Sequence, residues 1–335
     1  MKDESPDYLW DRSGEVDPEI ARLEELLAPL RHRGTPPALP PRVRARGVLT
    51  RVRPLLAAAA ALVLAAGVWF AWGAIRGGWR VEALAGEPLV NGEALDERGL
   101  LRRGGSLVTD AVSRARIRVG QIGRVDVEPD THVALVTAGT REHRLALERG
   151  TIHARIWAPP RFFFVNTPWA EAIDLGCAFT LQVDDSGAGL LRVTHGWVQF
   201  AYGGREAYIP QGAVGATRPG FGPGTPRYED APASFAAALE LLDFGAPDDP
   251  RRTSALHDIV SAARPRDALT LWHLLSRGSP EERLRVYERL ALLASPPARA
   301  TRDAVLAGDR PALDAWWDSF EIEGTSFWSR LLTRF

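Results

Sequence analysis

The sequence contains very little cysteine, and this scarcity removes whole classes of site. Cys177 is the only cysteine among 335 residues, so the chain can neither close a disulfide within itself nor build a cysteine-rich zinc site. An excess of charge of one sign is also missing, because 41 basic residues face 42 acidic residues. This balance supplies no general electrostatic attraction to nucleic acid, and we expect no direct nucleic-acid partner.

Recognisable catalytic motifs are missing as well. The sequence has no Gly-x-Ser-x-Gly element, no phosphate-binding loop and no dinucleotide-binding glycine pattern. Four histidines fall in different predicted strands or turns, without the close spacing of metal ligands: His132, His143, His153 and His195. We therefore expect a protein that is not an enzyme and that holds no cofactor and no metal.

One long apolar run stands out from the mixed composition. Residues 55–75 read LLAAAAALVLAAGVWFAWGAI, without a charged or strongly polar side chain. At about 1.5 Å per residue, a helix of this length would span roughly the 30 Å core of a bilayer. The run predicts a transmembrane helix over residues 54–76, with the lipid bilayer as a partner. Its distance from the N-terminus distinguishes it from a cleaved signal peptide.

The charges on either side of this run predict its orientation. Two arginines, Arg76 and Arg80, follow the run and soon give way to Glu82 and Glu87, whereas five arginines precede it: Arg42, Arg44, Arg46, Arg51 and Arg53. Positive charge is retained on the cytoplasmic side of a membrane. We therefore expect a single-pass protein of the bacterial inner membrane, with a cytoplasmic N-terminus and periplasmic C-terminal domains.

Residues 1–33 are expected to form a cytoplasmic helical segment. Asp17 as cap and Pro18 at the first helical position predict where its helix starts. An apolar cluster and an apolar stripe at helical spacing form a candidate partner-binding surface: Tyr8, Leu9, Trp10, Ile20, Leu23, Leu27 and Leu30. The stripe either packs on the cluster or binds a partner, and so short a segment favours the partner. Residues 34–53 form a tether rich in proline and arginine.

Residues 79–228 are expected to form an all-β domain, because short strand-like runs alternate with Gly, Asp and Asn. A stacked sheet, a jelly roll or a β-solenoid would fit this pattern. The clearest strand runs from Ile173 to Val183 in strict alternation, with Cys177 on its apolar face. Burial there raises the pKa of a thiol and makes it unreactive. A turn or bulge is expected at His195 and Gly196.

Residues 233–335 are expected to form an all-α domain, either a small bundle or a solenoid-like stack. Three helix starts are signalled by Ser279, Ser295 and Asp309, each followed within two residues by proline. Glu282 completes a capping box with the first of them. Three tryptophans are expected as core or groove anchors: Trp272, Trp316 and Trp317.

Within the β region, the stretch TPWAEAIDLGCAFTLQVDDSGAGLLRVTHGWVQF resembles the FecR domain of membrane-bound regulators of extracytoplasmic-function sigma factors. The resemblance covers roughly residues 100–218. It consists of a Thr-Pro, an Asp-Leu-Gly and a Val-x-x-Gly-x-Val pattern, which fall on Thr167, Pro168, Asp174, Leu175, Gly176, Val193, Gly196 and Val198. Cys177 stands at the position after the Asp-Leu-Gly, where the family commonly has a threonine. It implies a cytoplasmic anti-sigma segment, one membrane span and a periplasmic β domain.

Taken together, these features predict a multi-domain transmembrane signalling protein of the anti-sigma, FecR-like type. Its expected partners are a sigma factor on the cytoplasmic side and a protein or ligand contacted in the periplasm. The alternative is a membrane-tethered periplasmic scaffold, or a module that binds a cell-wall polymer or another ligand, without binding a sigma factor.

Overall fold

The computed structural model describes residues 15–30, 62–64, 67 and 78–320, and the chain divides into two compact units, Met1–Val63 and Leu64–Phe335. The first unit contains helix α2 (Pro18–Leu27), which continues into the 3-10 turn η1 (Ala28–Leu30). The Asp17 carboxylate accepts a hydrogen bond from the Glu19 amide at 2.9 Å and caps this helix. The helix start predicted at Asp17 and Pro18 is confirmed.

The predicted fold class and the predicted membrane location both need correction. Of residues 54–76, the structure describes only 62–64 and 67; the rest of that segment lies outside the described residues. A span needs about 20 consecutive helical residues, whereas α7, at 14 residues, is the longest helix in the part of the chain that the structure describes. None of the helices described is long and apolar enough to cross a membrane. This finding contradicts the single transmembrane helix and the inner-membrane topology predicted from it.

In the second unit, short strands form two sheets that share the long strand β9 (His143–Ile156). Strand pairs are antiparallel in both sheets, with the exception of the parallel pair of β9 and β10. In the first sheet, β9 lies between β7 (Gly123–Val127) and β12 (Ala178–Val183). The other members are, in spatial order, β4 (Arg98–Leu101), β1 (Trp79–Ala85), β6 (Arg114–Val119), β7, β12, β13 (Gly189–His195) and β16 (Ala213–Arg218). Two short strands, β17 (Gly222–Pro223) and β18 (Arg227–Tyr228), pair with β16.

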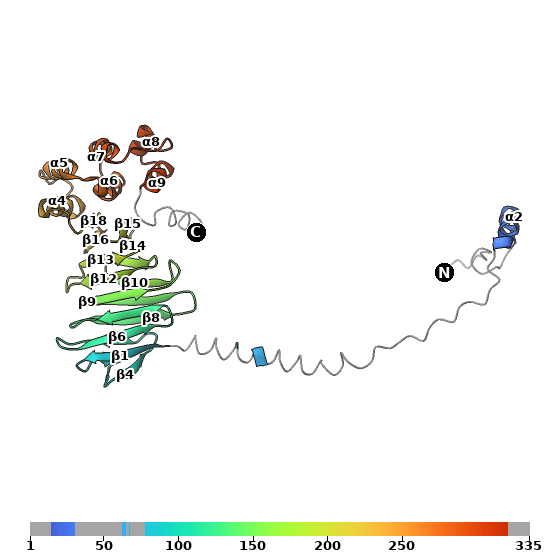
Figure 1. Cartoon of the computed structure of the whole chain (residues 1–335), viewed down its shortest axis with the longest axis horizontal. Coiled ribbons are helices and arrows are strands. Elements are labelled where there is room, and N and C mark those ends of the chain that lie inside the picture. Colours follow the sequence, from blue (N-terminus) through green and yellow to red (C-terminus); the bar gives the residue numbers. More distant parts are fainter. Residues whose placement is uncertain (1–14, 31–61, 65–66, 68–77, 321–335) are drawn as a thin grey trace. The chain divides into compact units, whose positions relative to one another are not determined.

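The second sheet contains the remaining strands. β9 lies in its middle, between β8 and β10. In spatial order its other members are β3 (Glu93–Ala94), β2 (Leu89–Val90), β5 (Ser106–Val108), β8 (His132–Ala138), β10 (Phe163–Thr167), β11 (Ala170–Asp174), β14 (Trp197–Tyr202) and β15 (Arg205–Pro210). Figure 1 shows the strands stacked from β4 and β1 at one end to β15 and β16 beside the helices.

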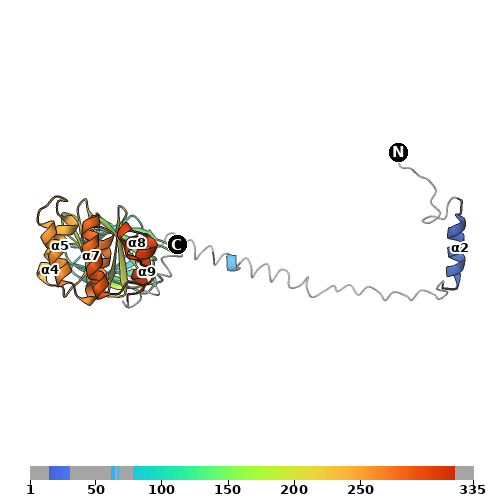
Figure 2. The ribbon, with the colours of Figure 1, turned by 90° about the horizontal axis from the view of Figure 1, so that it is seen from above.

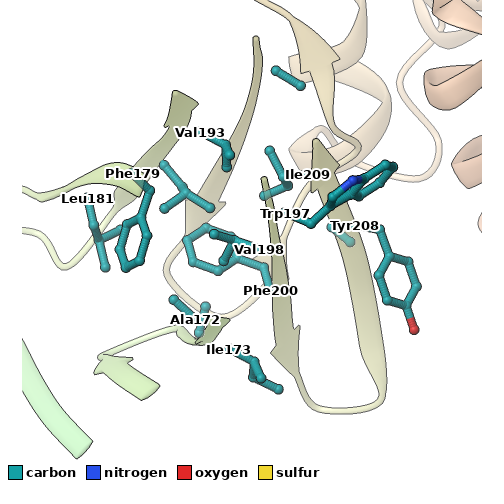
Figure 3. Packing of buried hydrophobic residues seen from close by; sticks show 14 of the residues in the cluster. Ala172, Ile173, Phe179, Leu181, Val193, Trp197, Val198, Phe200, Tyr208 and Ile209 are labelled. Atoms are coloured by element: carbon teal, nitrogen blue, oxygen red, sulfur yellow. The ribbon is translucent and has the colours of Figure 1, made fainter. Parts of the chain in front are cut away.

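Alternate residues of these strands fill the core. In β12, Phe179 and Leu181 are buried, while Thr180 and Gln182 point away from the core. Figure 3 shows Phe179, Leu181 and Val193 from the first sheet lying together with Ala172, Val198 and Phe200 from the second. The period-two alternation therefore correctly identifies which side chains are buried.

The C-terminal helices gather at one end of the stack, where they lie side by side in the view of Figure 2. They are α4 (Ala233–Phe244), α5 (Arg252–Ala262), η2 (Pro265–Asp267), α6 (Ala268–Leu275), α7 (Pro280–Leu293), α8 (Arg302–Ala307) and α9 (Arg310–Asp318). The starts predicted at Ser279 and Asp309 are confirmed by their capping hydrogen bonds. The start predicted at Ser295 is wrong, because the next helix begins at Arg302 with Thr301 as its cap.

One continuous core joins the strands to the helices. The buried cluster extends from Trp79 to Phe320 without a break between the two regions, so strands and helices do not form the separate domains of the predicted fold class. The expected core tryptophans are buried, and the rings of Trp272 and Trp317 lie 4.6 Å apart.

The helices also complete the hydrogen bonding of the last strands. His273 of α6 accepts a hydrogen bond from the Tyr208 amide at 3.0 Å through Nε2. Thr270 donates to the Pro226 carbonyl at 2.8 Å. Arg277 donates to the Glu206 carbonyl at 2.9 Å. The unpaired backbone groups of an edge strand can pair with strands of other chains. Here side chains from the helices form hydrogen bonds with these groups.

Candidate functional site

The Asp-Leu-Gly and Val-x-x-Gly-x-Val parts of the FecR-like motif meet at a corner of the β region, whereas Thr167 and Pro168 lie at the other end of β11. Thr167 closes the hairpin of β10 and β11, because its hydroxyl donates to the Ala170 carbonyl and accepts from the Ala170 amide, both at 2.9 Å. Beyond the hairpin, β11 pairs with β14 in one sheet, while β12 pairs with β13 in the other. The Asp-Leu-Gly and the Gly-x-Val segments therefore lie where two adjacent strands change sheets together.

Asp174 organises this corner. Its side chain is buried, and its carboxylate accepts hydrogen bonds from the amides of Gly176 and Cys177, each at 3.1 Å. The Cys177 thiol donates to the same carboxylate. On the facing strand, the Trp197 carbonyl accepts from the Leu175 amide at 3.2 Å. Backbone amides that leave a ladder at a corner need other acceptors, and Asp174 supplies them here.

Glycine is required where the two crossing segments meet. Gly196 has a φ of +72°, a conformation that glycine adopts readily and other residues only at a cost. A Cβ at this position would collide with the carbonyl oxygen of Gly176. The turn predicted at His195 and Gly196 is thus confirmed as a crossing between sheets. Val193 and Val198, on either side of it, are buried in the core.

The continuous strand predicted from Ile173 to Val183 is interrupted at this corner, which is a correction. β11 ends at Asp174 and β12 begins at Ala178. Leu175 and Cys177 are both buried between these strands as predicted, but Asp174 is buried as well, so the alternation of buried residues breaks at the corner and resumes in β12. Periodicity alone could not reveal the change of sheet.

Burial governs the electrostatics of the corner. Desolvation raises the pKa of the Asp174 carboxyl to about 7, against the hydrogen bonds from Cys177 and Gly176, which lower it. Desolvation and the neighbouring Asp174 charge raise the pKa of the Cys177 thiol well above its usual value. A thiol in this state is a poor nucleophile. The arrangement therefore holds the corner together and offers no reactive group.

The apolar stripe of α2 is the second candidate surface. Leu23 and Leu27 are each 57% exposed, and Leu30 is 80% exposed, while Ile20 is partly buried. Tyr8, Leu9 and Trp10 lie outside the described residues. The helix contains no buried residue, so its stripe is accessible along its length.

The predicted histidines do not converge. His132 pairs with Glu148 at 2.8 Å, and the ring of His143 lies 5.8 Å from the ring of Trp79 in a tilted arrangement. The described residues include no group of three or more His, Cys, Asp or Glu side chains that could hold a metal ion.

One histidine belongs to a polar chain that was not expected from the sequence. His153 lies 2.8 Å from the Thr180 hydroxyl through Nδ1 and 3.4 Å from Glu128 through Nε2. These residues line an open pocket of about 470 Å³ on the first sheet. The strand of Thr180 is paired on both sides, with β9 and β13, so its backbone amides are engaged within the sheet.

Comparison with known proteins gives only distant likenesses. No protein-family model matches the chain, and no curated protein matches it. Two crystal structures of a "putative anti-sigma factor" from Parabacteroides distasonis are similar at 16% sequence identity with a TM-score of 0.34. The first match covers 40% of this chain and 63% of the other; the second covers 47% and 73%. A TM-score of this size is too low to establish a shared fold.

Proposed function

We propose that this protein is a regulator that binds a sigma factor through the apolar stripe of α2. The observation that carries the proposal is the exposure of Leu23 and Leu27 on the capped helix α2 and of Leu30 in the 3-10 turn that continues it. Amphipathic helices with apolar residues at this spacing dock into apolar grooves of partner proteins. The FecR-like motif of the β region supports the choice of a sigma factor as the partner.

In this proposal, the protein acts by binding and not by catalysis. A contact made by the unit of residues 64–335 changes the availability of α2, and the sigma factor is held or released accordingly. Such coupling requires that the contacting ligand or protein bind one state of this protein more tightly than the other state. The second unit acts as the part that receives the contact, because its pockets offer surfaces for a ligand.

The test is a pull-down of sigma factors from the native cell extract, with the full chain as bait and the recovered proteins identified by mass spectrometry. The variant Leu23→Asp with Leu27→Asp removes two apolar side chains, each contributing ~1.5–3 kcal/mol when buried. Recovery should therefore drop by about 100-fold or more.

A matched variant controls for charge and for helix propensity. Ala21→Asp with Ala28→Asp adds the same two carboxylates to exposed positions beside the stripe. It should leave recovery of the sigma factor unchanged. If no sigma factor is recovered by the unaltered chain, or if both variants lose it equally, the proposal fails. The ligand-binding module then becomes the better description, and the pockets of residues 78–320 become its candidate sites.

A further inference from the structure

A pocket of about 770 Å³ lies where the end of the β region meets the helices. Its walls come from the β14–β15 hairpin around Tyr202, the turn at Phe221, the end of α4 with the segment after it, and the start of α7. This volume is within the range of small-molecule sites in proteins. The pocket is distinct from the α2 stripe and from the FecR-like corner.

The carboxylates of this pocket are already engaged by protein groups. Asp243 accepts from the Thr225 amide at 2.6 Å and pairs with the buried Arg277 at 3.3 Å. Glu282 caps the start of α7 and pairs with Arg252 at 3.2 Å. Two arginines and two carboxylates therefore neutralise each other within the walls.

Arg205 is left as the uncompensated cation of the pocket. Its Nη1 donates to the Phe221 carbonyl at 3.1 Å, and no ion pair joins this guanidinium to a carboxylate among residues 78–320. Its charge is felt inside the pocket by Arg277. Burial lowers the pKa of Arg277, and repulsion from the nearby Arg205 lowers that pKa further. An anion placed beside Arg205 would relieve this repulsion.

Apolar groups surround this cation. Phe221 packs edge-on against Phe244 at 5.9 Å, which holds its ring in place at the rim. Leu242 and Pro247 extend the apolar lining on the helical side. Ligand sites commonly combine such a lining with a few fixed polar groups that orient the ligand.

We propose that this pocket binds a small carboxylate with an apolar body, its carboxylate paired with Arg205 and its apolar part against Phe221 and Leu242. The same chemistry is offered by a free organic acid and by the carboxyl end of a peptide. This site does not depend on sigma-factor binding, so either proposal can fail without the other.

Calorimetric titration of the full chain with N-acetylphenylalanine at low salt tests the proposal. N-acetylphenylalanine amide, which lacks the carboxylate, should bind at least about ten-fold more weakly. Arg205→Gln should weaken N-acetylphenylalanine by a similar factor. Arg192→Gln, a substitution of a surface arginine that pairs with Glu229 outside the pocket, should leave binding unchanged.

A second variant guards against loss of folding. Ala246→Glu adds a carboxylate to an exposed position of the pocket wall, and it should also weaken N-acetylphenylalanine by repulsion. Phenylacetate distinguishes a free organic acid from the carboxyl end of a peptide, because it lacks the acetylamino group of N-acetylphenylalanine. If phenylacetate binds as tightly as N-acetylphenylalanine, the pocket is assigned to free acids; if it binds more weakly, the pocket is assigned to peptide ends. Absence of millimolar binding, equal binding of the amide, or unchanged binding by a folded Arg205→Gln variant would each overturn the proposal.

Discussion

Asp174→Asn should change how the stability of the protein depends on pH. Burial raises the pKa of the folded-state carboxyl from 3.8 to about 7. Between these values the folded protein retains a proton that the unfolded chain has released, so the free energy of unfolding falls as pH rises through this window. Since one pKa unit corresponds to about 1.4 kcal/mol, the full effect is ~4 kcal/mol.

The asparagine removes this dependence, because it is uncharged at every pH and its amide oxygen still accepts from the Gly176 or Cys177 amide. The assay is urea unfolding of the full chain at pH values from 4 to 8, with the free energy of unfolding of the variant compared with that of the unaltered protein. The difference, variant minus unaltered protein, should rise by ~4 kcal/mol from pH 4 to pH 8.

Asp184→Asn provides the matched control. Asp184 also accepts hydrogen bonds from neighbouring amides, but in an exposed turn, where the bond from the Ser186 hydroxyl lowers its pKa. Its contribution is present above the unfolded pKa and is lost only as pH falls below about 3.8, so the difference for this variant should stay nearly constant from pH 4 to pH 8. A pH-independent difference for Asp174→Asn, or one that falls as pH rises, would refute the account of the corner.

Three further predictions concern the core. Burial lowers the pKa of His273 to about 3, so its contribution to stability is lost as pH falls below about 6.5. In the same unfolding assay, the free energy of unfolding of His273→Gln, relative to that of the unaltered protein, should therefore rise as pH is lowered from 7 to 4. Gly196→Ala should cost ~2 kcal/mol or more, seen as a lower thermal midpoint, whereas Gly203→Ala, which has a positive φ but open space, should cost only ~1 kcal/mol. Cys177 is buried and its thiol pKa is raised, so a thiol reagent such as 5,5′-dithiobis(2-nitrobenzoic acid) should label it at pH 8 only after denaturant is added; fast labelling of the native protein would contradict this burial.

Local signals in the sequence located several features correctly. The caps at Asp17, Ser279 and Asp309 mark helix starts because a capping side chain bonds amides only two or three residues away. The alternation through Phe179 and Leu181 identifies buried positions because side chains on a strand alternate between its two faces. Ser295 fails as a helix start because a Ser-Pro pair also suits a turn, and the chain there continues without helix until Arg302.

The apolar run at residues 55–75 led to the contradicted predictions. An uninterrupted series of apolar side chains can be read from the sequence alone. A transmembrane span also needs a continuous helix of sufficient length. The helices that the structure describes do not supply one. The predicted location and orientation relied on that single segment, so they were corrected together with it.

The helix starts at Asp17, Ser279 and Asp309, the buried face of β12 and the burial of Cys177 all follow from neighbouring residues in the sequence. Tertiary structure alone decided that the strand from Ile173 changes sheets at Asp174, that helical side chains such as His273 complete the edge of β15, and that Arg205 pairs with no carboxylate among residues 78–320. Local rules act over a few residues. The bond between His273 and Tyr208 joins residues 65 positions apart, and such contacts exist only after the chain has folded.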